Sequence, residues 1–286
     1  MKKIILLILF CVMPCAYAAP RIATSDWTVS ETLTAIGAPP LVAGDKVSYQ
    51  KWVGYPRLPA QTADFGVRMQ PNIEYLARLR PDFFVQTAFY MGSADSLRKI
   101  APVHQIDMAD ERGTTWDKTV SATRELAKLA QRETAAETLI TATEQRFMQQ
   151  KQQLSKIAHR PVAVVQFINA RQVRIYGDTS LFHVVLGKLG LRNAWTGASN
   201  QWGFANIGLG ELARLPENTL LLVVKPHPVD VGRTLQHSAL WRRLPMSRAD
   251  NHRVLTAVWA YGGLAAMGRF GDLLVDAAVH GKQDNW

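Results

Sequence analysis

The residues that could catalyse a reaction or bind a metal directly are dispersed along the sequence. None of the seven histidines has the His-x-x-x-His or His-Glu-x-x-His spacing of a zinc site. Ser180 and His183 could belong to a nucleophile–base pair, but no Gly-x-Ser-x-Gly turn surrounds the serine. A helix cap at Ser180 or Asp178 explains this segment better. The sequence thus offers no hydrolase or metal motif, although it leaves paired catalytic carboxylates open.

Arg68 stands out in the segment "DFGVRMQPN", between Gly-Val and Met-Gln-Pro. Pro71 suits the first turn of a helix, and the apolar residues after it have helical spacing. The arginine is therefore predicted to lie on the turn that precedes this helix. It is the one residue of the segment that the scaffold pattern does not explain, which makes it a candidate functional residue.

Aromatic residues recur in loops that contain glycine. Four segments after predicted strands each carry a tryptophan or a tyrosine, namely "SYQKWVGYP", "TAFYMGS", "SNQWGF" and "AVWAYGG". Such side chains combine a flat apolar body with a polar tip, and together they predict a pocket with aromatic walls. The alternative for any single residue is ordinary packing of the loop beneath its lobe.

Residues 1–18 have the pattern of a secretory signal peptide. Two lysines precede the short apolar run "IILLILFCVM", and "AYA" ends at Ala18, where cleavage is expected. The residues before Cys15 do not suit a lipoprotein signal. Because Cys11 and Cys15 both lie in this leader, the mature chain would contain no disulfide and no cysteine nucleophile. We therefore expect a periplasmic protein.

The chain is basic, with a formal net charge of +10, of which the leader contributes two lysines. No long run of lysine or arginine occurs, so we expect a solvated basic surface and no nucleic-acid partner. An acidic ligand or partner remains the lesser alternative.

Short apolar strands alternate with helical segments, which predicts an α/β fold with largely parallel sheets. No glycine-rich phosphate loop follows any of the strands. The expected strands are "PRIAT", "LVAG", "DFFVQ", "HQIDM", "VAVVQFI", "VRIYG", "TLLLVV" and "VLTAV".

Residues 134–158 contain neither glycine nor proline and only sparse apolar positions, as expected of one long helix between two lobes. A weak repeat supports this division, since residues 31–44 resemble residues 182–197 and "LARL" occurs at both 76–79 and 212–215. We therefore expect two similar α/β lobes, residues 19–133 and 159–286. The polar and aromatic loops of the two halves would face one another across an interlobe cleft.

The segments "KWVGYPRLP", "DFGVRMQPNIEYL", "NQWGF" and "AVWAYGG" resemble, in order and spacing, the periplasmic ferric-hydroxamate siderophore-binding proteins of iron ABC importers. The resemblance covers essentially the whole mature chain and implies a bilobal protein with a rigid backbone helix, without catalysis or cofactor. It implies that Arg68 and Tyr90 bind the hydroxamate oxygens, where a guanidinium supplies several donors. The aromatic walls it implies are Trp52, Trp202, Trp259 and Tyr261. The siderophore wraps the iron, so no direct metal ligand is expected from the protein.

The same resemblance implies a monomer that docks on a transmembrane permease, which works with a cytoplasmic ATPase, through one acidic residue on each lobe. Glu74 and Glu211 are the best matches, although Glu74 also suits the first turn of a helix. The sequence departs from its close relatives at Ala260, where a bulkier aromatic residue is common, so a larger cleft or a different siderophore preference is expected. The alternatives are a haem or cobalamin cargo and, in another class, an exported α/β hydrolase.

Overall fold

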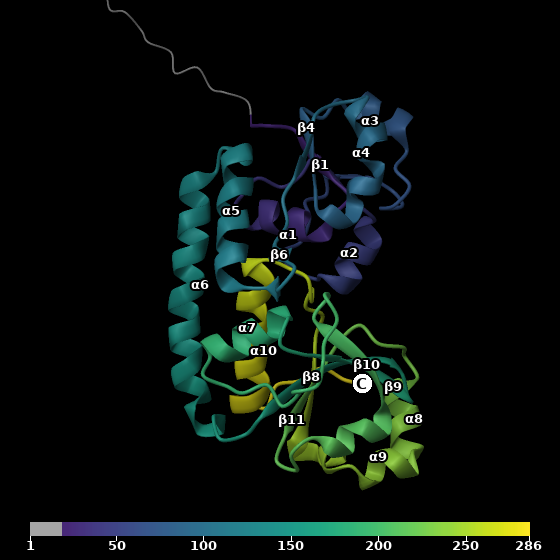
Figure 1. Cartoon of the computed structure of the whole chain (residues 1–286), viewed down its shortest axis with the longest axis vertical. Helices are drawn as coiled ribbons and strands as arrows, with labels where there is room; N and C mark the ends of the chain where they lie inside the picture. The colour runs from purple at the N-terminus through teal and green to yellow at the C-terminus, as the bar shows by residue number, and fades with distance from the viewer. Residues whose placement is uncertain (1–18) are drawn as a thin grey trace, which may run out of the picture.

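A computed structural model describes residues 19–286, which form two α/β lobes stacked along one long axis (Figure 1). The predicted fold class is confirmed. The leader expected at residues 1–18, its cleavage site and both cysteines lie outside the described residues.

The sheet of the N-terminal lobe has the strand order β3-β2-β1-β4-β5, and all of its neighbouring strands are parallel. Helices cover both faces, so β1 and β4 are almost wholly buried, as is typical of parallel sheets. The strands are β1 Ile22–Thr24, β2 Val42–Ala43, β3 Ala63–Asp64, β4 Phe83–Gln86 and β5 Val103–Gln105.

Polar side chains set the starts of several N-terminal helices. Asp26 caps α1, and Asn72 caps α3 by accepting from the backbone N–H of Tyr75 at 2.9 Å. Pro71 was predicted to open this helix, but it lies one residue before the cap. The elements are α1 Trp27–Ala35, α2 Lys46–Trp52, α3 Ile73–Leu79, η1 Ala88–Ser93, α4 Ala94–Arg98, the hairpin β6 Ala109–Asp110 and β7 Gly113–Thr114, and α5 Trp116–Ala130.

The sheet of the C-terminal lobe has the order β10-β9-β8-β11-β12 and is mixed. Strands β8, β11 and β12 are parallel as predicted, whereas β9 is antiparallel to both β8 and β10. The reason is the two-residue connection between β8 and β9, which is too short for the crossover that a parallel pair requires. The strands are β8 Val162–Asn169, β9 Gln172–Tyr176, β10 Phe204–Gly208, β11 Leu220–Val224 and β12 His252–Leu255.

Ser180 is the N-cap of α7, one of the two roles considered for it. Its buried hydroxyl donates to the carbonyl of Gly177 at 2.6 Å and accepts from the backbone N–H of His183 at 3.1 Å. The hydroxyl is thus used for capping and not for a nucleophile–base contact. The helical elements of this lobe are α7 Leu181–Lys188, η3 Leu209–Arg214, α8 Val231–His237, α9 Ala239–Arg243, η4 Pro245–Ser247, η5 Ala249–Asn251 and α10 Leu264–Val279.

The internal repeat corresponds to equivalent structural steps in the two lobes. Helices α1 and α7 are each followed by a left-handed glycine, Gly37 with φ 74° and Gly190 with φ 72°. In the first lobe the chain then forms β2. In the second lobe the expected strand is reduced to a single parallel bridge between Val162 and Asn193.

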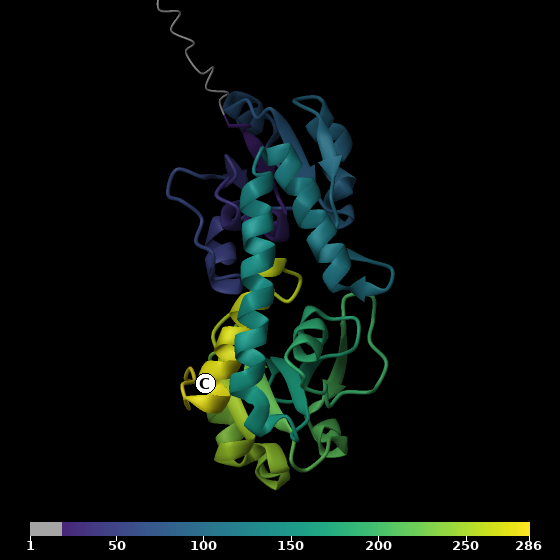
Figure 2. The same ribbon diagram turned by 90° about the vertical axis from the view of Figure 1, so that its left-hand side faces the viewer.

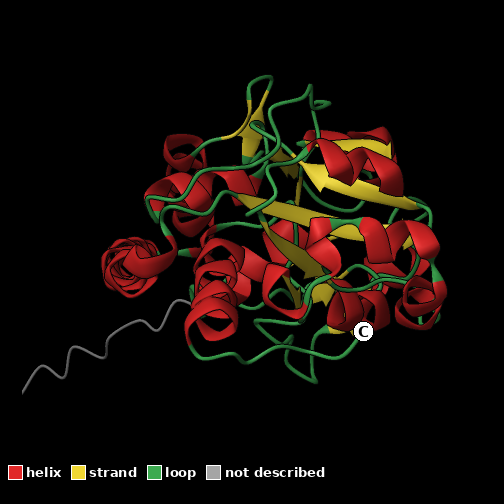
Figure 3. Cartoon of the chain, turned by 90° about the horizontal axis from the view of Figure 1, so that it is seen from below, coloured by secondary structure: helices red, strands yellow, loops and turns green. Residues whose placement is uncertain are grey.

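Helix α6, Glu133–Gln153, runs along both lobes and continues as the short η2, Leu154–Ile157, where a single helix over 134–158 was expected (Figure 2). It packs against α5 of the first lobe and α10 of the second. Seen along the long axis, α6 lies end-on at the edge of the molecule (Figure 3). This position explains its sparse apolar stripe, because only one face is covered. Within residues 19–286, no helix is long and apolar enough to cross a membrane.

Candidate ligand-binding site

A cleft of about 350 Å³ lies between the lobes. The first lobe contributes residues from the start of α1, from α2 and from the turn after β3, and the second lobe contributes strands β8 and β9 and the loop before α10. The lining residues are Trp27, Asp45, Ser48, Trp52, Arg68, Gln166, Arg174, Tyr176, Val258, Trp259, Ala260 and Tyr261.

The structure brings the six predicted ligand-binding residues together. Four of them line the cleft, namely Arg68, Trp52, Trp259 and Tyr261. Tyr90 lies beside Arg68, whose Cζ is 5.5 Å from the centre of its ring. Trp202 is 42% exposed at the rim, with its ring centre 6.1 Å from that of Tyr261.

The guanidinium of Arg68 is stacked on the indole of Trp27, with Cζ 3.5 Å from the ring centre. Its stem passes over Gly44, where an added Cβ would lie 2.6 Å from Cγ of the arginine. Gly44 therefore leaves the space that this arginine occupies. Within the described chain, Arg68 contacts aromatic faces and forms no ion pair. Stacking fixes the plane of the guanidinium and leaves its edge, which carries the N–H donors, available to a ligand.

Tyr90 is buried next to Asp26. Burial raises the pKa of the Tyr90 phenol, the charge of Asp26 raises it further, and Arg68 lowers it. Burial also raises the pKa of the Asp26 carboxyl, against hydrogen bonds that include one from Thr87 at 2.6 Å. Tyr90 therefore stays a neutral phenol with a proton to donate.

Trp259 is held by hydrogen bonds that cross between the lobes. Its indole N–H donates to Oγ1 of Thr28 at 3.0 Å, and that hydroxyl donates to the carbonyl of Tyr261 at 2.9 Å. The Trp259 ring makes edge contacts, each with centres 5.0 Å apart, with Trp27 and with Tyr261. The aromatic wall is thus rigid on this side of the cleft, whereas Trp202 at the rim is exposed.

Several lining residues were not predicted from the sequence. Trp27 is the first residue of α1, separated from the end of β1 by two residues, and the general rule that ligand groups sit near strand ends could have indicated it. Gln166 and Arg174 lie inside strands, where a polar residue in the sequence indicates a side chain that faces solvent. The other unpredicted residues are Asp45, Ser48, Tyr176 and Val258.

The cleft wall presents hydrogen-bond donors and aromatic faces, which suit an organic ligand with polar oxygens. Residues 19–286 contain no group of three or more His, Cys, Asp or Glu side chains that could hold a metal. Among the described residues, the cleft wall contains no histidine, methionine or cysteine. It offers two guanidinium groups, aromatic faces, neutral hydroxyl and amide groups and one carboxylate, that of Asp45.

A family model for the periplasmic binding proteins matches residues 22–251. The chain belongs to the periplasmic binding protein family. It is 32% identical over 262 residues to the iron(3+)-hydroxamate-binding protein FhuD of Escherichia coli K12, an alignment that covers 92% of this chain and 88% of that protein.

Solved structures of the family share the same architecture. The siderophore-binding protein FhuD of Vibrio cholerae, solved with bound Fe3+–Desferal, superposes with a TM-score of 0.84 at 26% identity and covers 92% of this chain and 98% of its own. The triscatecholate siderophore-binding protein FeuA of Bacillus subtilis has a TM-score of 0.71 at 16% identity, covering 92% and 95% of the two chains, and shows the fold alone.

The two acidic residues predicted to dock on the permease differ in how far their carboxylates already interact within the protein. Glu74 is exposed in the first turn of α3, on the far side of the molecule from α6 (Figure 1). Glu211 in η3 accepts from the backbone N–H of Gly208 at 3.0 Å and lies 3.5 Å from Arg214. The carboxylate of Glu211 is therefore partly used within its own turn.

Proposed function

We propose that this protein is exported to the periplasm, binds ferric hydroxamate siderophores in the interlobe cleft without catalysis, and delivers them to an ABC permease of the inner membrane. The observation that carries this proposal is the free edge of the Arg68 guanidinium, fixed on Trp27 in an aromatic cleft. The same class of cargo is supported by two relatives, the iron(3+)-hydroxamate-binding protein FhuD of Escherichia coli and the FhuD of Vibrio cholerae that was solved with Fe3+–Desferal.

The chemistry of a ferric hydroxamate matches the cleft. The siderophore supplies the iron ligands and presents electron-rich oxygens at its surface. Arg68 and the neutral phenol of Tyr90 donate hydrogen bonds to these oxygens, and a charged donor makes such bonds stronger. Trp52, Trp202 and Trp259, with Tyr261, pack against the apolar linkers, which needs no strict geometry.

Haem fits the cleft less well. Its wall offers tyrosines as possible axial ligands, but burial raises the pKa of both Tyr176 and Tyr261. Without iron these phenols are protonated, and an axial tyrosine ligand binds iron as the phenolate, so haem ligation here would have to displace a phenol proton from a buried site.

Quenching of tryptophan fluorescence in the purified mature protein tests the proposal, because three tryptophans line the cleft and a fourth, Trp202, lies at its rim. The ligands are ferric desferrioxamine B, ferrichrome, haem and cyanocobalamin. We expect saturable quenching by at least one ferric hydroxamate and none by the matching iron-free siderophore at the same concentration. Saturation by haem or cobalamin, with no response to either ferric hydroxamate, would overturn the proposal.

Charge reversal at the proposed docking residues is expected to reduce uptake and leave ligand affinity unchanged. Glu74→Lys should lower the initial uptake rate of radioactive ferric siderophore by at least about fivefold, since even the loss of an exposed ion pair costs up to about 1 kcal/mol and a like-charge contact costs more. Glu211→Lys should have the smaller effect, because Gly208 and Arg214 already engage its carboxylate.

The matched control is Glu144→Lys, which changes an exposed glutamate of α6, a helix on the opposite side of the molecule from α3 (Figure 1). It applies the same charge change to a different face and should leave uptake normal. A Glu74→Lys, Glu211→Lys double variant with normal uptake would refute the docking roles.

A further inference from the structure

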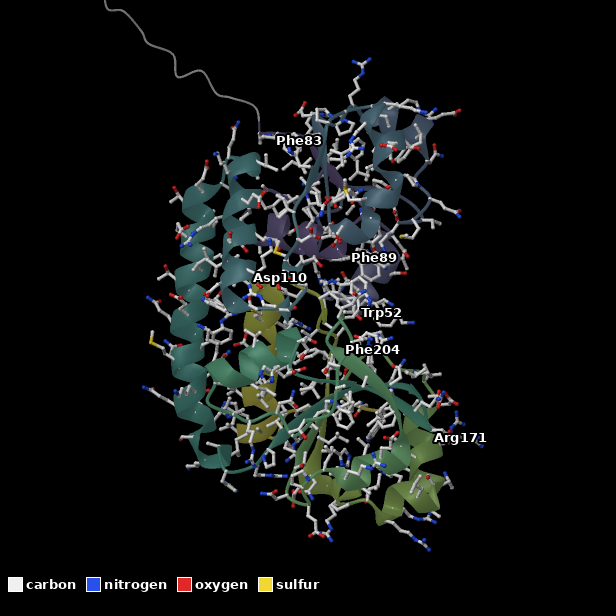
Figure 4. All side chains as sticks on the ribbon, in the orientation of Figure 1. Trp52, Phe83, Phe89, Asp110, Arg171 and Phe204 are labelled. Atoms are coloured by element: carbon white, nitrogen blue, oxygen red, sulfur yellow. The ribbon has the colours of Figure 1, made fainter. Side chains whose placement is uncertain are left out.

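Arg174 is a second arginine in the cleft, and it comes from the lobe opposite Arg68. It lies on β9, with Cζ 4.2 Å from the ring centre of Phe204 and Nη1 3.4 Å from Oε1 of Gln166. Phe204 in the C-terminal lobe and Trp52 in the N-terminal lobe both lie at the boundary between the lobes (Figure 4). Like Arg68, Arg174 is held in a fixed orientation by an aromatic ring, here that of Phe204.

Gln166 strengthens this positioning. Its amide donates to the carbonyl of Pro226 at 3.1 Å, and its Oε1 also accepts from the hydroxyl of Tyr176 at 3.4 Å. The amide is therefore anchored at both ends, and the single long bond to Arg174 orients the guanidinium without satisfying all of its donors.

The charge of Arg174 is not compensated within the protein. Its Nε is shielded from solvent and has no hydrogen-bond partner in the described part of the chain. None of the ion pairs formed by residues 19–286 includes it. The cleft wall carries one carboxylate, Asp45, and this group accepts from the backbone N–H of Ser48 at 3.0 Å as the cap of α2. Two arginines against one capping carboxylate leave the cleft with an excess of positive charge.

An uncompensated guanidinium charge beside aromatic surface is unfavourable, and a ligand that brings an acceptor to the remaining Nη donors of Arg174 removes this cost. A neutral trihydroxamate can satisfy Arg68, but it brings no negative charge to the second arginine. A complex in which a carboxylate accompanies the hydroxamates brings both the acceptor and the charge. Arg174 therefore discriminates between ligands that Arg68 treats alike.

We propose that Arg174, oriented by Gln166 and Phe204, selects ferric hydroxamate complexes of net negative charge that carry a carboxylate. This inference rests on the proposed function and names the class of cargo within it. A citrate-centred dihydroxamate is such a cargo, because its central hydroxy-carboxylate also binds the iron and leaves the complex anionic.

Fluorescence titration with ferric schizokinen, a citrate-centred dihydroxamate, and with neutral ferrichrome tests this selectivity. The wild-type protein should bind ferric schizokinen the more tightly of the two. Arg174→Gln should weaken binding of ferric schizokinen about tenfold and binding of ferrichrome less than about threefold, because only the anionic complex loses its charged partner. Arg171→Gln, an exposed arginine just before β9, removes the same charge outside the cleft and should change neither affinity.

The outcomes separate this inference from the proposed function. Equal effects of Arg174→Gln on the two complexes, or no effect on either, would overturn the role of Arg174 and leave ferric hydroxamate binding intact. If Arg174→Gln and Arg171→Gln weaken the binding of ferric schizokinen equally, the effect comes from net charge alone, and the role of Arg174 is also overturned. Failure of the wild-type protein to bind either complex would refute the proposed function, and this inference with it.

Discussion

Replacement of Arg68 by alanine is expected to lower the affinity for ferric desferrioxamine B about 10- to 100-fold, or about 1.4 to 2.7 kcal/mol. The variant loses the charge-assisted hydrogen bonds proposed between the guanidinium and the hydroxamate oxygens. Its free energy of unfolding should change by about 1 kcal/mol or less, because Arg68 forms no ion pair with the described residues and loses only its contacts with the rings of Trp27 and Tyr90. Fluorescence titration and urea unfolding measure the two quantities.

Two further variants sharpen this test. Arg68→Lys keeps the charge but loses the planar fork, so its affinity should fall between those of the wild type and the alanine variant. Arg78→Ala removes an exposed arginine of α3 and should leave affinity unchanged. Wild-type affinity in Arg68→Ala would show that this arginine does not bind the ligand.

Much of the scaffold was predictable because its signals are local. The alternation of apolar strands with helices predicted two α/β lobes, and the run of helix-forming residues indicated α6 within a few residues. The antiparallel strand β9 was missed because its sequence resembles that of any buried strand. Its direction depends on the short turn from β8, and thus on connectivity rather than on composition.

The site was predictable where side chains break a pattern. Arg68 and the aromatic residues of the glycine loops are conspicuous because the scaffold does not require them. Arg174 alternates with buried apolar residues along β9, as solvent-facing residues do, and Gln166 is a single polar residue in the apolar run of β8. Only the position of the first lobe against this sheet shows that this end of the sheet faces the cleft.

Glu31 illustrates an interaction that the sequence could not reveal. It lies in the middle of α1 and is fully buried, and Oε2 of its carboxyl accepts from the backbone N–H of Gly263 at 2.8 Å. Gly263 is the N-cap of α10, in the other lobe and 232 residues away. The carboxyl thus accepts a hydrogen bond from an N–H group at the start of α10, and without Glu31 this N–H group would be buried without a partner.

Burial raises the pKa of the Glu31 carboxyl from 4.5 to about 8, although the Gly263 N–H and the charge of Arg269 oppose this shift. In the unfolded chain the group titrates near its ordinary value. Between these two values the folded protein therefore holds more protons than the unfolded protein. Stability should accordingly fall as the pH rises through this window, and the contribution of Glu31 should level off above about pH 8.

Removal of this titrating group is expected to flatten the pH dependence of stability. In the wild-type protein, Glu31 should lower the free energy of unfolding by about 3 kcal/mol between about pH 5.5 and about pH 8.5. Glu31→Gln keeps a carbonyl oxygen for the Gly263 N–H and cannot ionise, so most of this slope should disappear. Urea unfolding at the two pH values measures the free energy of unfolding. The control is Glu144→Gln, at an exposed position of α6, which should retain the wild-type slope.

The same pair of measurements shows whether the lobes depend on this contact. If Glu31→Gln matches the wild-type protein at about pH 5.5 and exceeds it in stability at about pH 8.5, the buried charge is what weakens the α1–α10 contact in alkaline solution. An unchanged slope in Glu31→Gln would instead assign the pH dependence to other groups. A loss of stability at both values would show that the amide does not replace the carboxyl as a partner for Gly263.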